Sequence, residues 1–259
     1  MAERAQRRTG GRWLGVALVL VLLGAVELGV RSGSINAALV PPPTEVALFI
    51  GKILATGAFI EPLAATLYLL FIAYFGASAL AVALGLLMGR FRVIHNLFEP
   101  LVELLRPLPK PALLPPLILF LGLGDLMKSV VVGLAVFFPV LINTVQGVQG
   151  VDPVLINTAR TFGYGRLGVL RKVILPAALP LIFAGMRVSL ALGRILVVIA
   201  EMLAGTGGLG YLILDMQRTF QVQSMYAWLA ILAVLGYALN ALFLALEHKV
   251  IHWAAARPE

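Results

Sequence analysis

Long apolar stretches recur along this chain, and one of them, Leu63–Met88, contains no charged residue. A helix of about 20 apolar residues crosses the hydrocarbon core of a bilayer. Only 12% of the 259 residues are charged, whereas a soluble domain carries about 25%. The sequence therefore predicts an all-α, polytopic membrane protein with about six transmembrane helices. An unusually apolar soluble helical core is the alternative.

The predicted spans divide the chain into segments. They are Trp13–Val30, Leu63–Met88, Leu101–Gly124, Ser129–Gln149, Val173–Leu203 and Met225–Leu246. The predicted segments are a basic N-terminus 1–12, a first transmembrane helix 13–30, an extracytoplasmic segment 31–62, a transmembrane domain 63–250 and a tail 251–259. The first span is too long for a signal peptide and lacks a cleavage site. The third span contains five prolines, and a broken helix is tolerated in a membrane only beside protein or a watery cavity.

The distribution of Lys and Arg predicts the orientation. With the N-terminus inside, twelve of these residues fall in cytoplasmic segments: Arg4, Arg7, Arg8, Arg12, Arg90, Arg92, Arg160, Arg166, Arg171, Lys172, Lys249 and Arg257. Four fall outside: Arg31, Lys52, Lys128 and Arg218. This excess satisfies the positive-inside rule, so both termini are predicted to be cytoplasmic. The same bias accounts for the net charge of +8 without a nucleic-acid partner.

The extracytoplasmic segment 31–62 is predicted to contain an interfacial helix after Pro41–Pro43. Thr44 is a candidate N-cap for it. Apolar residues follow at helical spacing: Val46, Phe49, Ile50, Ile53 and Leu54. We expect this helix to lie on the outer leaflet, with simple packing as the alternative.

Metal and cofactor sites are not expected on this chain. It has no cysteine, which excludes thiolate ligands. His248 and His252 are spaced four residues apart, a spacing that could hold a metal. Beside the end of a span, such histidines are typically interfacial polar residues.

The segment 150–176, between the fourth and fifth spans, has clear helix signals. Asp152 followed by Pro153 is a strong helix start, and Gly163 favours a left-handed stop. The enclosed helix places three residues on one side: Leu155, Ala159 and Phe162. A helix this short is marginal alone in water and needs a packing partner. It either rests on its own membrane domain or docks into a groove on a soluble partner.

This segment resembles the loop signature of the ABC importer permeases. In that signature Glu-Ala-Ala is followed after three residues by Gly, and after nine more by Ile-x-Leu-Pro. The chain has Asn157-Thr158-Ala159, then Gly163, then Val173–Pro176, at the same spacing. Asn157 replaces the glutamate and Thr158 the first alanine. The change at Asn157 removes a charge that the family's glutamate could use in an ion pair, but it does not remove the helix.

The resemblance extends over roughly residues 60–250 and is to the nitrate, aliphatic-sulfonate and taurine branch of the family. The passages that carry it are Leu105–Pro107, Pro115–Leu117, Phe120–Gly124, Phe137–Pro139, Asn143–Thr144, Gly150–Pro153, Leu175–Pro180, Ala200–Met202 and Gly207–Tyr211. It implies a type I, MetI-like permease fold that works as a dimer, with this chain as one half of the path. Two cytoplasmic ATPases, which bind ATP and Mg, drive transport, and an extracytoplasmic binding protein delivers the solute.

The resemblance also implies that the 150–176 segment is a coupling loop for the ATPase. Its implied contact residues are Asp152, Pro153, Leu155, Asn157, Thr158, Ala159, Arg160, Phe162, Gly163, Leu175 and Pro176. The chain itself has no Gly-x4-Gly-Lys-Ser/Thr phosphate loop. It is therefore expected to be a non-catalytic subunit with no cofactor of its own.

Charged residues inside the fifth span are functional candidates because charges within a bilayer are costly. Arg187, Arg194 and Glu201 are spaced i, i+7, i+14 and share one stripe of the helix. The arginines either line the path and attract an anion, or pair with acids and carbonyls within the bundle. All three residues are candidates for the substrate path.

Other polar positions have less specific interpretations. Arg106 and Lys110, among prolines, form either a gate or an interfacial anchor. Asp125 and Lys128 are predicted to mark a solvated outer turn, and Gly207–Gly210 a flexible outer turn that touches the binding protein.

Nitrate, sulfonates, taurine, bicarbonate, cyanate and vitamin precursors are all possible cargoes. A secondary active transporter is the alternative function, although no inverted repeat is visible. A membrane enzyme would need a clustered acid/base or metal constellation.

Overall fold

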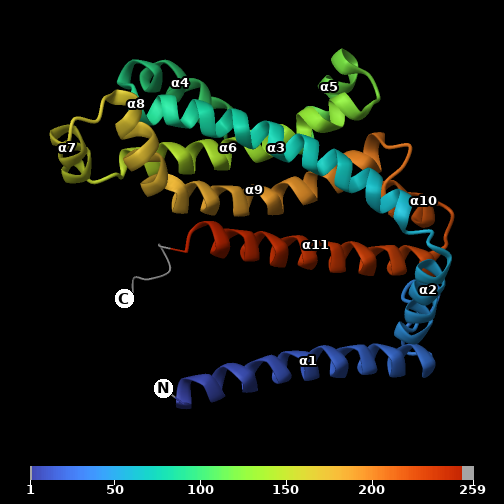
Figure 1. Ribbon diagram of the computed structural model, residues 1–259. Coiled ribbons are helices and arrows are strands. Elements are labelled where there is room, and N and C mark those ends of the chain that lie inside the picture. Colours follow the sequence, from blue (N-terminus) through green and yellow to red (C-terminus); the bar gives the residue numbers. More distant parts are fainter. Residues whose placement is uncertain (1, 253–259) are drawn as a thin grey trace. The chain divides into compact units, whose positions relative to one another are not determined.

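The computed structural model describes residues 2–252, with side chains from residue 14 onward, and every element within that part is helical (Figure 1). In chain order the elements are α1 (Ala2–Arg31), α2 (Pro43–Thr56), α3 (Ile60–Arg90), α4 (Arg92–Leu105), η1 (Lys110–Leu113), α5 (Leu114–Leu121), α6 (Asp125–Gln149), α7 (Pro153–Thr161), α8 (Arg166–Val169), η2 (Leu170–Ile174), α9 (Leu175–Ala204), α10 (Leu209–Arg218) and α11 (Val222–Val250). The all-α prediction is confirmed. The side chains of the basic segment 1–12 and most of the tail 251–259 lie outside the described residues.

Five of the described helices are long and apolar enough to cross a membrane, and their number becomes six if one bent pair forms a single span. The five lie in α1, α3, α6, the continuous run Arg166–Ala204, and α11. They contain the predicted spans one, two, four, five and six. The predicted number of about six transmembrane helices is therefore confirmed, with the bent pair counted as one span.

The predicted third span, Leu101–Gly124, is broken in the structure. The segments Arg92–Leu105 and Lys110–Leu121 meet at an angle of 91°. Pro107, Pro109 and Pro111 follow one another at this bend, and proline lacks the N–H that would continue a helix. Proline also disfavours the helical conformation in the residue before it. The polypeptide therefore turns sharply where the sequence alternates proline with other residues.

The chain divides into two compact units. The first unit contains Met1–Ile60 and Leu212–Ala233, and the second contains Glu61–Tyr211 and Val234–Glu259. The second unit is the larger and holds α3 to α9. It also contains every candidate residue of the loop and of the fifth span.

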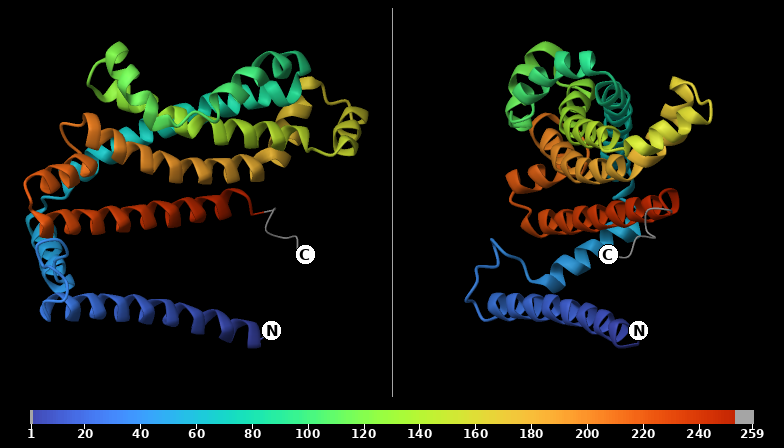
Figure 2. Two further views of the ribbon diagram at one scale, coloured as in Figure 1. Left: turned by 180° about the vertical axis from the view of Figure 1, so that it is seen from behind. Right: turned by 90° about the vertical axis from the view of Figure 1, so that its left-hand side faces the viewer.

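In the second unit, α6 packs closely against both α3 and α9 (Figures 1 and 2). A Cβ added to Gly85 of α3 would lie 2.6 Å from the Cβ of Thr144 on α6. A Cβ added to Gly185 of α9 would lie 2.7 Å from the Cβ of Asn143. Small residues at helix interfaces let backbones approach closely, which is how helices associate in a membrane. The glycines at these two positions therefore bring the three helices together.

Hydrogen bonds between helices add to this packing. The hydroxyl of Tyr74 on α3 donates to the backbone carbonyl of Met186 on α9, at 3.0 Å. The hydroxyl of Ser189 on α9 donates to the carbonyl of Val136 on α6, at 2.8 Å. These bonds satisfy buried hydroxyls that would otherwise be costly in an apolar interior. They fix the register of α9 against its two neighbours.

In the first unit, Glu27 near the end of α1 holds the start of α2. Its carboxylate accepts hydrogen bonds from the backbone N–H and the hydroxyl of Thr44, at 3.0 and 2.8 Å. Arg31 also donates to Glu27, at 2.6 Å. The predicted N-cap, Thr44, is therefore wrong, because Pro42 occupies the cap position and Glu27 supplies the acceptor. The predicted helix itself is present as α2.

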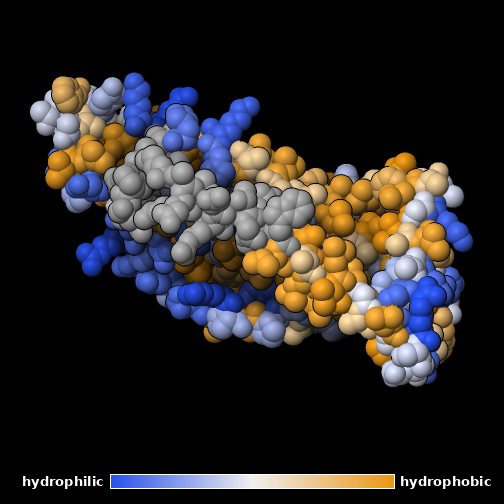
Figure 3. All heavy atoms as spheres, turned by 90° about the horizontal axis from the view of Figure 1, so that it is seen from below, coloured by the Kyte–Doolittle hydropathy of each residue, from blue (hydrophilic) through white to orange (hydrophobic). Residues whose placement is uncertain are grey.

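The described surface is strongly apolar. Side chains from Leu14 to Leu23 of α1 are exposed although most of them are apolar. On the face drawn in Figure 3, hydrophobic side chains cover much of the visible surface. Exposed apolar surface of this extent indicates contact with lipid or with another protein.

Candidate functional site

The helix predicted between the fourth and fifth spans is present as α7 and begins and ends as its sequence indicates. The carboxylate of Asp152 accepts a hydrogen bond from the backbone N–H of Val154, at 2.8 Å, which satisfies a free donor of the first turn. Gly163 adopts a φ of +80° just after the helix. The N–H of Tyr164 then reaches back to the carbonyl of Ala159, at 3.1 Å, as in a Schellman motif.

The three residues predicted to share one side of α7 differ in burial. Ala159 is buried, with 6% of its surface exposed, and packs in a cluster with Val151 and Ile174. Leu155 and Phe162 are 52% and 77% exposed. The domain therefore covers this side of α7 only at Ala159 and leaves Leu155 and Phe162 exposed. We call the exposed apolar residues of this region the α7 patch: Val154, Leu155, Phe162 and Leu167.

The remaining loop residues surround the α7 patch. Asn157, Thr158 and Arg160 are exposed. The ammonium group of Lys172 lies 4.9 Å from the centre of the Tyr164 ring. After α7 the chain passes through α8 and the π-helical turn η2 directly into α9 at Leu175, so that the loop is continuous with the fifth span.

Arg187 and Arg194 both join α9 to α11. Arg187 forms an ion pair with Glu247. The guanidinium of Arg194 donates to the carbonyl of Gly236 and to that of Leu190, the latter at 3.3 Å. Gly236 leaves room for this contact, since a Cβ there would lie 3.0 Å from the Arg194 guanidinium nitrogen. Each arginine therefore has partners within the bundle.

Glu201, the third residue of the stripe, is only 1% exposed and lies at the opposite end of α9 from the loop. One carboxyl oxygen, Oε2, accepts the hydroxyl of Thr66 on α3 at 3.0 Å and the N–H of Gly210 at 2.9 Å. The Thr66 hydroxyl in turn accepts the N–H of Leu209 at 2.9 Å. Leu209 and Gly210 open α10, whose first N–H groups have no partner within the helix. We call these four residues the Glu201 network.

The glycine-rich turn is packed around Glu201. Gly208 has a φ of +95°, in the left-handed region that favours glycine. A Cβ there would meet the Glu201 carboxyl group. A Cβ on Gly210 would lie 2.9 Å from the Cβ of Glu201. The segment predicted as a flexible turn is therefore tightly held, because its glycines allow the backbone to approach a buried side chain.

A cavity of about 450 Å³ adjoins the Glu201 network, and the sequence did not indicate it. Its lining residues are Glu61, Ala64, Ala65, Tyr68, Leu69, Asp125, Lys128, Glu201, Thr206 and Gly207. They come from the start of α3, the start of α6, the end of α9 and the turn that follows it. Among the described residues no group of three or more His, Cys, Asp or Glu is placed to hold a metal ion.

Lys128 was predicted to lie on a solvated turn, and this is wrong. The residue is 7% exposed, and its ammonium group pairs with Asp125 at 2.6 Å. A buried ammonium needs such a partner because desolvation is costly. No sequence signal links Glu61, Asp125 and Glu201, since each is an isolated acid beside an apolar run.

Lys110 caps the end of the helix before the bend. Its ammonium group donates to the carbonyls of Leu105, Arg106 and Leu108, each at 2.9 Å. It also lies 4.6 Å from the centre of the Phe138 ring. The last carbonyls of a helix have no intrahelical partner, and Lys110 supplies donors to them.

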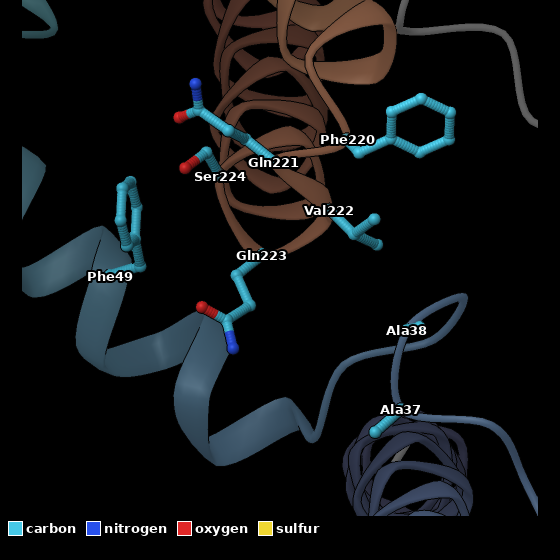
Figure 4. Close-up of a pocket in the computed structure, with 8 residues that line it drawn as sticks. All are labelled: Ala37, Ala38, Phe49, Phe220, Gln221, Val222, Gln223 and Ser224. Carbon is cyan, nitrogen blue, oxygen red and sulfur yellow. The ribbon is translucent and has the colours of Figure 1, made fainter.

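A further cavity, of about 550 Å³, lies within the first unit (Figure 4). Its lining residues are Ala37, Ala38, Phe49, Phe220, Gln221, Val222, Gln223 and Ser224, and none of them is charged. In Figure 4 the ring of Phe220 points away from Phe49. A site without charges is poorly suited to an ionic solute, so we place no ionic site here.

Comparison with solved structures defines the class of fold. An inward-facing conformation of the MetNI methionine ABC transporter contains a chain that aligns with a TM-score of 0.61 over 71% of this protein and 92% of that chain, at 21% identity. The fold is thus that of a MetI-type permease.

Residues 81–252 match the model of the family described as binding-protein-dependent transport system inner membrane component, and the protein belongs to this family. A Bacillus subtilis (strain 168) protein named for aliphatic sulfonates transport is 30% identical, covering 97% of this chain and 93% of its own length. The taurine transport system permease protein of Escherichia coli (strain K12) is 30% identical, with 95% and 94% covered. The protein is a transmembrane permease subunit of an ATP-driven ABC importer, in the sulfonate and taurine branch.

Proposed function

We propose that two copies of this chain form the path for a small sulfonate or a related organic anion. Separate cytoplasmic ATPase subunits bind ATP and Mg and drive the movement, and an extracytoplasmic binding protein delivers the solute. The observation that carries the proposal is the α7 patch, an exposed apolar surface on a helix that is fixed at its base.

The α7 patch has the features of a docking surface for the ATPase. Ala159 anchors the helix in its own domain, whereas Phe162 and Leu155 contribute little to that cluster and face outward. A nine-residue helix is marginal by itself. The Asp152 cap and the contacts of Ala159 keep it folded before a partner binds. The neighbouring Arg160 is exposed and adds a positive charge to the surface.

The orientation follows from the positive-inside rule. The coupling loop 150–176 and both termini lie in the cytoplasm, and segment 31–62, with α2, lies outside. The cavity beside the Glu201 network is at the opposite end of α9 from the loop, and therefore near the extracytoplasmic side. The segments 1–12 and 251–259 are cytoplasmic in this topology.

The names of the two relatives support a sulfonate cargo, either an alkanesulfonate or the aminosulfonate taurine, and nitrate is the other solute to test. Arg187, Arg194 and Glu201 are candidates for the path. Arg187 is the most accessible of them, since 45% of its side chain is exposed. A guanidinium binds sulfonate oxygens well, so an anion could compete with Glu247 for it.

Deletion of residues 155–162 tests the docking surface. We expect the shortened protein to reach the membrane and to lose copurification of the ATPase. In lipid, the intact complex should hydrolyse ATP faster when the binding protein carries its solute, with taurine, an alkanesulfonate and nitrate as the three candidates. If the deletion variant retains the ATPase, the assignment of α7 fails. Uptake that depends on an ion gradient and not on ATP would favour the secondary transporter.

A further inference from the structure

We propose that Glu201 is a positioning residue for transport, and that it transmits movement of the coupling loop to the walls of the cavity at the other end of α9. This inference rests on the proposed function. Glu201 acts through hydrogen bonds to Thr66, Gly210 and, by way of Thr66, Leu209. It does not require contact with the solute.

Helix α9 provides the mechanical connection. Its 30 residues correspond to about 45 Å at 1.5 Å per residue. At the loop end, Ile174 and Ala178 pack in the same cluster as Ala159 of α7. At the other end, Glu201 lies within one turn of the final residue, Ala204. A displacement of α7 therefore reaches Glu201 through one continuous helix.

The Glu201 network joins three elements by groups that each have a specific partner. The Oε2 atom of Glu201 receives two donors, one from α3 and one from α10. The Thr66 hydroxyl both donates to Glu201 and accepts from Leu209. Because buried donors and acceptors are costly to leave unpaired, these elements move together unless the whole network is broken.

The glycines allow close packing, so no free space is left that would absorb such a movement. The backbone at Gly208 and Gly210 touches the Glu201 side chain with no room for a Cβ. Packed interiors transmit displacement because they have few voids and low compressibility. A shift of α9 therefore shifts the turn that precedes α10.

Glu201 itself and neighbours of the network form part of the cavity wall. Glu201, Thr206 and Gly207 line it from the α9 side, and Glu61 and Tyr68 line it from α3. Thr66 lies on α3 between those last two residues. The Glu201 network thus sets the separation of two walls of the cavity, and its position determines how open the cavity is to solute.

Site-directed labelling tests whether the Glu201 network controls how open the cavity is. The chain suits the method because it contains no cysteine. A single cysteine replaces Ala64, an exposed residue of the cavity wall. The rate of maleimide labelling is measured in the assembled transporter in lipid, with and without a non-hydrolysable ATP analogue. We expect the analogue to change the rate roughly fivefold or more, which is the lower end of the usual coupling between two sites.

Two pairs of variants separate the effect of the hydrogen bonds on the labelling response from the effects of side-chain size and charge. Glu201→Leu removes the acceptor and Thr66→Val removes the hydroxyl, so both should abolish most of the nucleotide response. Glu201→Gln keeps a carbonyl oxygen that can accept both donors, and Thr66→Ser keeps the hydroxyl, so both should preserve the response. Ser78→Ala is the matched control, because Ser78 is another buried hydroxyl of α3 and lies outside the network.

The outcomes distinguish the inference from the function on which it rests. A full response in both Glu201→Leu and Thr66→Val overturns the role of Glu201, and so does an equal loss in Glu201→Gln and Glu201→Leu. If the Glu201→Leu protein does not assemble with the ATPase, the Thr66→Val protein provides the test. A full nucleotide response in Thr66→Val then overturns the role of Glu201. If the Ala64→Cys protein itself does not respond to nucleotide although the ATPase is bound, the proposed coupling fails instead.

Discussion

The two ends of α9 are built in different ways. At the loop end, the groups that shape α7 are neighbours in sequence, from Asp152 to Gly163, and the outward face is exposed. At the cavity end, the Glu201 network joins residues that are 135 and 143 positions apart. Every member of that network is buried or closely packed.

This difference has a functional meaning. A surface that must bind another subunit has to remain exposed, and local capping can hold it in shape without burying it. A hydrogen-bond network that must move several helices together has to be buried, and it needs partners from each of those helices. The docking surface depends on which side chains it exposes to the partner. The buried network depends on which groups its side chains contact within the fold.

The largest expected effect contrasts two residues of the same short helix. Phe162→Glu should abolish association with the ATPase and leave the stability of the permease unchanged, because Phe162 is exposed in this chain. Ala159→Glu should instead destabilise the permease by several kcal/mol, because it buries an unpaired charge. Copurification of the ATPase and thermal unfolding in detergent measure the two effects. Equal destabilisation by both variants would show that α7 does not divide into an anchor and a docking face.

A smaller effect is expected from two glycines of the same turn. Gly210→Ala should destabilise the permease by about 1–3 kcal/mol, as is usual for overpacking, because its Cβ would press on the Val198 carbonyl and on Glu201. Gly207→Ala is the matched control, since no atom lies within 4 Å of a Cβ at that position. Thermal unfolding of the two purified variants makes the comparison. If both shift the transition alike, the turn is not packed against Glu201 as described.

Much of the fold could be predicted from the sequence because the bilayer imposes a simple rule. A run such as Leu63–Met88 has few alternatives to a spanning helix, and helix α3 contains it. The start and stop of α7 were likewise predicted, since Asp152, Pro153 and Gly163 act on their immediate neighbours. The bend after α4 was only partly predicted, because prolines indicate a break and not its angle.

The cavity and its network could not be predicted, for an equally physical reason. Lysine is seldom buried, so the sequence predicts a solvated Lys128. Its partner Asp125 is only three residues away, but only the fold brings α3 and α9 around the ammonium group and buries it. The spacing of Arg187, Arg194 and Glu201 places them on one stripe of a helix but does not identify their partners. The partners in α3 and α11 lie 135, 60 and 42 positions away along the chain. Gly210 of α10 is only nine positions from Glu201, but a turn separates the two helices.

The next prediction concerns the cap of α7. Asp152→Ala removes the acceptor for the Val154 N–H and should cost about 1 kcal/mol of local helix stability. If the ATPase binds α7 only as a helix, its affinity should fall up to about fivefold, the equivalent of that free energy. Asp152→Ser retains a capping oxygen and should behave as the parent protein. A titration of the ATPase against the permease in lipid measures this, and equal losses in both variants would exclude capping as the cause.

The smallest effect on stability is expected at the pair between Arg187 and Glu247. Arg187 is nearly half exposed, and exposed ion pairs contribute about 0–1 kcal/mol. The pair is nonetheless informative about transport. If Arg187 only holds α9 to α11, Arg187→Gln and Glu247→Gln should have equal, small effects on solute-stimulated uptake, and the double variant should add little to either. If Arg187 also meets the anion, Arg187→Gln should reduce uptake, whereas Glu247→Gln should leave it unchanged or raise it by freeing the guanidinium.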